Sequence, residues 1–101
     1  RIRLGLPVET SCKDFLMARY DISLGGFYAY PQARIPDLLS TASALYALSA
    51  MGVNVASLAP GCRSFVESLW SDVGGFCGSP GDPIPDCEYT CYALLALGAL
   101  L

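Results

Sequence analysis

Residues 74–97 read GGFCGSPGDPIPDCEYTCYALLAL, and residues 25–48 read GGFYAYPQARIPDLLSTASALYAL. These stretches repeat one pattern at an offset of 49: Gly-Gly-Phe, a proline-containing loop, Ile-Pro-Asp and a long apolar run. Between residues 25–52 and 74–101, 13 of 28 aligned positions are identical. Upstream the offset is 50, where Cys12 and Phe15 align with Cys62 and Phe65. We therefore expect two units, at about 11–52 and 61–101, with a period typical of helical arrays.

Each unit is predicted to contain two helices joined by a Gly/Pro-rich loop. The first helices are expected at about 11–20 and 62–70, because apolar residues recur there at helical spacing. The second helices are expected at about 38–51 and 87–101. These are apolar nearly all round, which is typical of helices buried on several sides. The predicted fold class is all-α, two tandem helical hairpins without a sheet.

Asp37 and Asp86 precede the second helices at equivalent positions of the two units. An aspartate at an N-cap accepts hydrogen bonds from free backbone N–H groups and faces the positive end of the helix dipole. The same two residues also resemble a catalytic carboxylate pair. Their repeat-equivalent placement favours capping.

Composition excludes several classes of function. The chain has 101 residues, is 53% hydrophobic and 15% charged, and carries 6 Lys+Arg against 9 Asp+Glu. Such a chain gains by collapsing and is not disordered. A net charge of −3 without a basic run argues against nucleic acid. The sequence contains no histidine, which removes His-activated nucleophiles and His-containing zinc sites.

The five cysteines are Cys12, Cys62, Cys77, Cys87 and Cys91. Their number is odd, and the spacing of Cys87 and Cys91 suits one helix face better than a disulfide. Small reduced thiols in a reducing compartment are the favoured interpretation. The alternative is a thiolate metal site from Cys77, Cys87 and Cys91, which lacks a CxxC pair and a histidine. We therefore expect neither a metal site nor a cofactor.

Residues 38–62 carry no charge, and an uncharged run of this length is long enough for a membrane span. Polar residues and Gly52 interrupt the run, so a buried helix followed by a loop is favoured. Membrane association stays open as an alternative, but no transmembrane span is expected. The sequence starts at Arg1 and stops within an apolar run. This favours a piece of a longer polypeptide.

The loop and helix of residues 74–97 resemble the repeat of protein prenyltransferase β subunits, within the wider terpenoid cyclase-like α/α toroids. In that family a GGF-x-G-[RK]-P loop leads to an Asp and then to an aromatic-Thr-aromatic-x-Leu helix. The resemblance covers about residues 10–101. It implies an inner ring of helices around an apolar cavity, where family enzymes bind an isoprenoid diphosphate beside a zinc ion held by Asp, Cys and His.

Most of the family's zinc-binding residues have no counterpart at the matching positions of this sequence. The zinc histidine precedes the inner-helix threonine, and here Ser40 and Tyr89 stand before Thr41 and Thr90. The Asp-x-Cys ligand pair is replaced by Asp86-Cys87 without the spacer and by Asp37-Leu38-Leu39. A prenyl diphosphate and a zinc-activated thiol need these groups. We therefore assign no catalytic, cofactor-binding or metal residue.

The resemblance also implies candidate roles for a loop cation and for residues that line the cavity. The expected loop cation is Tyr30 in one unit and Ser79 in the other, which leaves Arg34 as a substitute or as a solvated surface residue. Tyr89 and Tyr92 are candidates for lining an isoprenoid cavity, although buried aromatics more often pack in a core.

Two hypotheses for the function follow. The first is a non-catalytic prenyltransferase-like repeat module, a structural or interaction subunit of a larger assembly. The alternative is a fragment of a prenyltransferase β-like subunit that transfers an isoprenoid from its diphosphate to a cysteine thiol. The expected partners are other protein subunits or the remainder of a longer chain. The predicted interface residues, on an apolar helix, are Leu94, Leu95, Leu97, Leu100 and Leu101.

Overall fold

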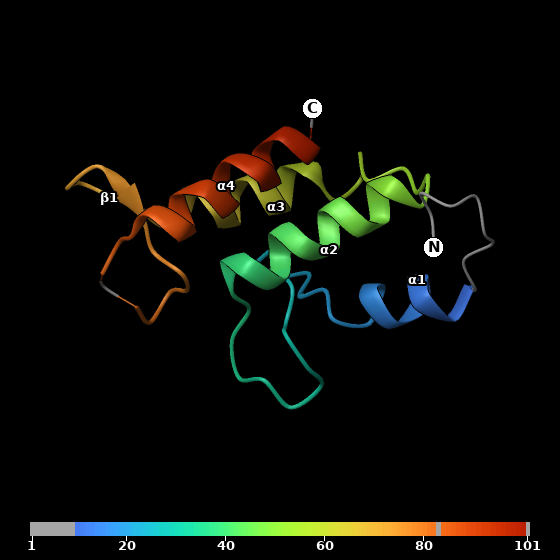
Figure 1. The fold of residues 1–101 in the computed structure, drawn as a ribbon. Helices are drawn as coiled ribbons and strands as arrows, with labels where there is room; N and C mark the ends of the chain where they lie inside the picture. Colours follow the sequence, from blue (N-terminus) through green and yellow to red (C-terminus); the bar gives the residue numbers. More distant parts are fainter. Residues whose placement is uncertain (1–9, 83, 101) are drawn as a thin grey trace.

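The computed structural model describes residues 10–82 and 84–100, which form two helical hairpins (Figure 1). The first pairs α1 (Thr10–Met17) with α2 (Leu38–Ala50), and the second pairs α3 (Ala59–Ser68) with α4 (Cys87–Ala99). Helices α2 and α4 lie side by side, run in the same direction and make the most extensive helix contact. The predicted class, all-α with two tandem hairpins of a partial α/α toroid, is confirmed.

Two helix boundaries differ from the prediction. Helix α1 ends at Met17, three residues early, because Tyr20 forms a bridge to Phe27 and leaves the helix. Helix α3 begins at Ala59 and holds Pro60 in its first turn, where no backbone donor is needed. The second helices begin at Leu38 and Cys87 as predicted and end within two residues of the predicted ends.

The prediction of no sheet is wrong. Strands β1 (Trp70–Ser71) and β2 (Gly75–Phe76) pair antiparallel, with Trp70 opposite Phe76. The intervening turn uses Gly74 at φ 102°, a left-handed conformation that suits glycine. Unit one places a single bridge, Tyr20 to Phe27, at the same point. The hairpin is therefore an elaboration of a contact present in both units.

One hydrogen-bond network fixes each Gly-Gly-Phe loop to the second helix of its unit. In unit one the Phe27 N–H donates to Thr41 Oγ1 at 2.9 Å, and the Thr41 hydroxyl donates to the Asp37 carbonyl at 2.7 Å. In unit two Phe76 donates to Thr90 Oγ1 at 3.1 Å, and Thr90 donates to the Asp86 carbonyl at 2.9 Å. The threonine thus satisfies a donor that the loop would otherwise bury unpaired.

The core is one cluster of side chains from α2, α3, α4 and the unit-one loop. Its fully buried large side chains include Phe27, Leu38, Leu45, Leu48 and Val66. The expectation that both second helices are buried on several sides holds for α2 only. In α4 only Ala93 and Ala96 are buried, because α2 and α3 pack on it and no further helix of the described residues covers its remaining face.

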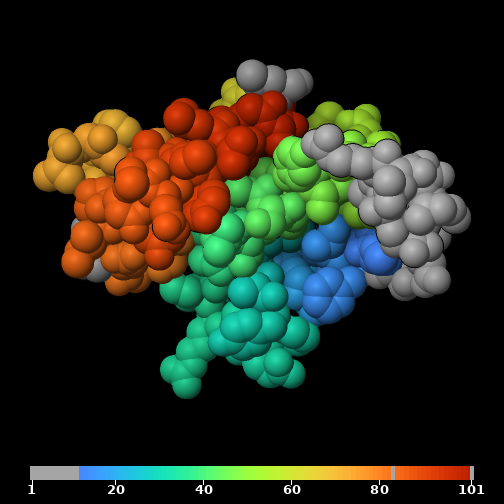
Figure 2. Space-filling view, viewed as in Figure 1, coloured from blue at the N-terminus to red at the C-terminus, as the bar shows by residue number. Residues whose placement is uncertain are grey.

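Each loop between the glycines and the second helix projects on the same side of the molecule, and the loop of residues 28–36 extends furthest (Figure 2). Among the described residues, none of the helices combines the length and the hydropathy that a bilayer crossing requires.

Candidate functional site

The first turn of α2 is held by Asp37. Its carboxylate accepts from the Ser40 N–H at 2.7 Å and from the Ser40 hydroxyl at 2.9 Å. Asp37 has extended backbone geometry and occupies the N-cap position. Both oxygens are therefore engaged in capping, which leaves Ser40 and Asp37 as partners of each other.

The first turn of α4 repeats this arrangement with one difference. Asp86 accepts from the Tyr89 N–H at 2.8 Å and is the N-cap residue. The Tyr89 side chain covers the Gly78 backbone, because a Cβ added at Gly78 would overlap the Tyr89 ring. Burial, with smaller contributions from the negative charges of Asp86, Asp82, Glu88 and Asp37, raises the pKa of Tyr89, so its phenol stays neutral at physiological pH.

A shallow apolar groove of about 320 Å³ runs along the seam between α2 and α4. It is lined by Ala42, Ser43, Tyr46, Tyr92 and Leu95. Of the two predicted cavity-lining tyrosines, Tyr92 lies in this groove and Tyr89 packs on Gly78.

A second groove opens on unit one between α1 and α2, with a volume of about 340 Å³. We call it the unit-one groove; its lining includes Phe15, Arg19, Ala29, Leu39, Ser43 and Ala47. The Arg19 guanidinium carbon lies 4.9 Å from the centre of the Phe15 ring, a cation–π contact. Phe15 is nevertheless 55% exposed, whereas its repeat equivalent Phe65 is 3% exposed.

A hollow of about 360 Å³ lies on unit two beside the start of α4. We call it the unit-two hollow; its lining includes Val73, Gly74, Gly75, Pro85, Cys87 and Thr90. Val73 is 80% exposed. A Cβ added at Gly74 would meet no atom within 4 Å, whereas one added at the equivalent Gly25 would overlap the Gly61 carbonyl.

The cysteines do not form a metal site among the described residues. Cys77 is buried beside β2, whereas Cys87 and Cys91 are exposed on α4. No group of three or more Cys, Asp and Glu side chains in residues 10–82 and 84–100 is arranged to hold a metal ion. Burial raises the pKa of the Cys62 thiol to about 11, so this group stays protonated.

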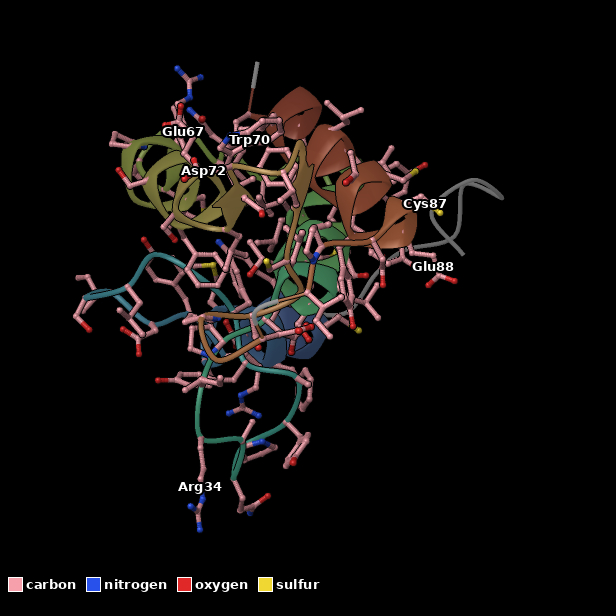
Figure 3. All side chains as sticks on the ribbon, turned by 90° about the vertical axis from the view of Figure 1, so that its left-hand side faces the viewer. Arg34, Glu67, Trp70, Asp72, Cys87 and Glu88 are labelled. Atoms are coloured by element: carbon pink, nitrogen blue, oxygen red, sulfur yellow. The ribbon has the colours of Figure 1, made fainter. Side chains whose placement is uncertain are left out.

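Figure 3 shows that Arg34 lies at the tip of the projecting loop and points away from the body. Cys87 and Glu88 lie on the first turn of α4, far from Arg34 in this view and on a different element. The structure therefore does not bring the candidate loop cation to the first turn of α4.

The predicted interface leucines lie on different sides of α4. Leu94 and Leu95 are 63% and 55% exposed. Leu97 and Leu100 are partly buried and pack against the core. Leu101 lies outside the described residues.

The parallel second helices, the flanking first helices and the loops anchored by threonine define the chain as a segment of an α/α toroid. Comparison with protein families identifies which one. The prenyltransferase alpha-alpha toroid domain matches residues 5–63 and again residues 53–101, and the chain belongs to this family. Comparison with curated proteins and with solved structures gave no match.

The zinc ion that the family implies does not fit the residues at the corresponding positions. Ser40 holds the histidine position in unit one and is bonded to Asp37 through both its N–H and its hydroxyl. In unit two Tyr89 occupies the position of the histidine, and its pKa is raised. A neutral hydroxyl and a neutral phenol are not among the ligands that proteins use for structural or catalytic zinc. We derive no chemical step through such an ion.

Sequence reasoning missed the unit-one groove and the unit-two hollow. The repeat equates Phe15 with Phe65, which is buried, whereas Phe15 itself is exposed. The repeat offset of 49 to 50 could have indicated both surfaces, because it identifies which residues of the two units would have equivalent partners in a longer array. The sequence does not show which of the two equivalents is covered.

Proposed function

We propose that this chain is a structural and interaction segment of a prenyltransferase-type toroid, which acts by packing against neighbouring toroid units and is not itself the transferase. The main observation in support is that Phe65 is 3% exposed, whereas its repeat equivalent Phe15 is 55% exposed. The same helical position is covered where it packs on the loop of another unit and exposed where no unit of the described residues packs on it. Stacked repeats bury their faces against neighbours in this way.

The exposed side of α4 supports the same proposal. Leu38, Ala42 and Leu45 of α2 are 0%, 4% and 0% exposed. Their equivalents Cys87, Cys91 and Leu94 are all exposed. Apolar patches of this kind on a soluble domain mark interaction surfaces. The side of α4 that a following unit would cover is therefore uncovered.

An extended chain tests this proposal. Residues 53–101 are repeated once after position 101, with Leu101→Gly to match Gly52, whose φ is 79°. If the exposed side of α4 accepts a following unit, the extended chain unfolds cooperatively at a higher urea midpoint than the 101-residue chain. It also binds less hydrophobic dye per unit. The matched control carries Leu94→Asp in the original unit two and loses the gain.

An unchanged midpoint in the extended chain contradicts the proposal. So does a 101-residue chain that binds no hydrophobic dye.

A transferase assay tests the proposal that the chain is not itself the transferase. The chain, zinc, farnesyl diphosphate and a cysteine peptide are incubated together. We expect no prenylated peptide, and zinc-dependent product would overturn this part.

The groove between α2 and α4 favours one second candidate, a fragment of a prenyltransferase β-like subunit. Tyr46, Tyr92 and Leu95 supply the aromatic and aliphatic lining that an isoprenoid chain requires. Titration with farnesyl diphosphate tests it. Saturable binding that Tyr92→Ala abolishes favours this candidate, whereas equal binding by both proteins or none argues against it.

A further inference from the structure

The contact between the two units consists of a protruding ring and the surface that receives it. Phe65 of α3 lies over the loop of unit one: a Cβ added at Gly26 would be 2.8 Å from the Phe65 ring and 2.8 Å from Pro36. Nearby, the Leu38 N–H of α2 donates to the Gly78 carbonyl at 2.7 Å. A ring from unit two is thus received by the glycine and the proline of the unit-one loop, and a backbone hydrogen bond joins the start of α2 to unit two.

Each half of this contact occurs a second time in the chain, and no counterpart among the described residues packs on it. The ring has its equivalent in Phe15, on the rim of the unit-one groove. The receiving surface has its equivalent in Gly75, Pro85 and Cys87, which line the unit-two hollow. The carbonyl of Gly78 corresponds to that of Ala29, which also lines the unit-one groove.

We propose that a second copy of this chain packs head to tail on the first, with Phe15 of one copy entering the unit-two hollow of the other. This inference rests on the proposed function and names the partner. The contact reproduces the internal one: Cys87, Cys91 and Leu94 of one copy cover the unit-one groove of the next. The Cys87 N–H donates to the Ala29 carbonyl, as Leu38 donates to Gly78.

The occupant is a second copy because the chain carries both halves of one interface on different surfaces. Such a contact is heterologous, so each association leaves one groove and one hollow open. A symmetric pairing of two α4 helices would instead use the same surface twice and would stop at a dimer. The volume of the hollow, about 360 Å³, also accommodates an aromatic ring.

Substitutions at two exposed residues distinguish head-to-tail packing from symmetric pairing of the α4 helices. Phe15→Asp removes the ring and leaves the hollow intact. Cys87→Glu fills the hollow with a charge and leaves the ring intact, and an acid in the first turn suits the dipole of α4. Ile22→Asp is the matched control, because Ile22 is 88% exposed and lines neither surface. Sedimentation equilibrium measures the masses, and circular dichroism verifies the helix content.

The unmodified chain and the Ile22→Asp control should associate with a mass that rises with concentration. Each of the other two variants alone should associate at least about tenfold more weakly, because a central aromatic contact is lost. Their equimolar mixture should form a 1:1 dimer that does not grow, since one intact ring meets one intact hollow. Leu39→Asp and Leu94→Asp serve as replacement variants if either substitution lowers the helix content.

Three results would overturn the inference. They are a monomeric unmodified chain at every concentration, a Phe15→Asp variant that associates as strongly as the unmodified chain, and a mixture that stays monomeric. If the chain is monomeric but the extended chain described above is stabilised, the second copy is the wrong partner and the proposed function stands. If the extended chain also shows no gain, both proposals fail.

Discussion

The Phe27 N–H and the Thr41 hydroxyl oxygen lie 2.9 Å apart, although 14 residues separate them in the sequence. Thr41 is completely buried, so this bond is shielded from water. The equivalent bond between Phe76 and Thr90 is 3.1 Å long and only partly buried. The same local chemistry therefore experiences two environments in one chain, which allows direct comparison of the two units.

Thr41→Val should destabilise the fold by about 1–3 kcal/mol, because a buried backbone donor loses its acceptor without a large change of shape. Thr90→Val should cost less, since water reaches Phe76 more easily. Thr41→Ser keeps the hydroxyl and serves as the control. Urea unfolding measures all three. Equal costs for the two valine variants would show that burial does not control this bond.

Gly25→Ala should be far more damaging than Gly74→Ala. Both glycines have positive φ, 86° and 102°, so each alanine carries a conformational cost of about 1–2 kcal/mol. At Gly25 the added methyl group also overlaps the Gly61 carbonyl, and overpacking adds about 1–3 kcal/mol. Gly74 has open space. Equal unfolding midpoints for the two variants would rule out the close approach of the loop to α3.

Acid should weaken the loop after α1. Hydrogen bonds from Tyr28, Ser23 and the Leu24 N–H lower the pKa of Asp21 to about 2, from 3.8. A depressed pKa in the folded state means that the stabilisation is present above about pH 4 and is lost as the pH falls toward 2. Asp21→Asn should therefore be less stable than the unmodified chain at pH 6 and approach it at pH 2.

Asp72→Asn is the control for the change in net charge. Its stability should run parallel to that of the unmodified chain across the same pH range. A constant difference between the unmodified chain and Asp21→Asn from pH 6 to pH 2 would contradict the assignment to Asp21.

Thiol reactivity should divide the cysteines into two groups. Cys62 is buried and its pKa is raised to about 11, so at pH 8 it is neither accessible nor ionised. We expect iodoacetamide to modify Cys12, Cys87 and Cys91 first, and Cys62 and Cys77 only after unfolding. Mass mapping after brief exposure, in dilute native buffer and in urea, measures this order. Early modification of Cys62 would show that the core opens locally.

Removal of either N-cap should cost about 1 kcal/mol, since two first-turn donors lose a partner in α2 and one in α4. Asp37→Ala and Asp86→Ala are the test variants, with Asp37→Asn and Asp86→Asn as caps of the same shape. Urea midpoints compare them. If alanine and asparagine variants were equally unstable, the negative charge and not the cap would be the stabilising element.

The elements that sequence predicts well are those fixed by short-range signals. The second helices start at Leu38 and Cys87 because an aspartate and a preceding proline set their first turns. The end of α1 was missed because the pairing of Tyr20 with Phe27 is a tertiary contact. The groove and the hollow were missed for a further reason: Phe15 and Phe65 have the same local pattern, and their exposure depends on the neighbour present.

The parallel pairing of α2 with α4 has a consequence for synthesis on the ribosome. Leu38 and its equivalent Cys87 are 49 residues apart, so α2 leaves the ribosome well before its partner helix is made. At about 5–20 residues per second, this delay lasts about 2–10 s. During that interval the apolar face of α2 has no α4 to cover it, and a chaperone that binds short apolar helices would have time to act on the nascent chain.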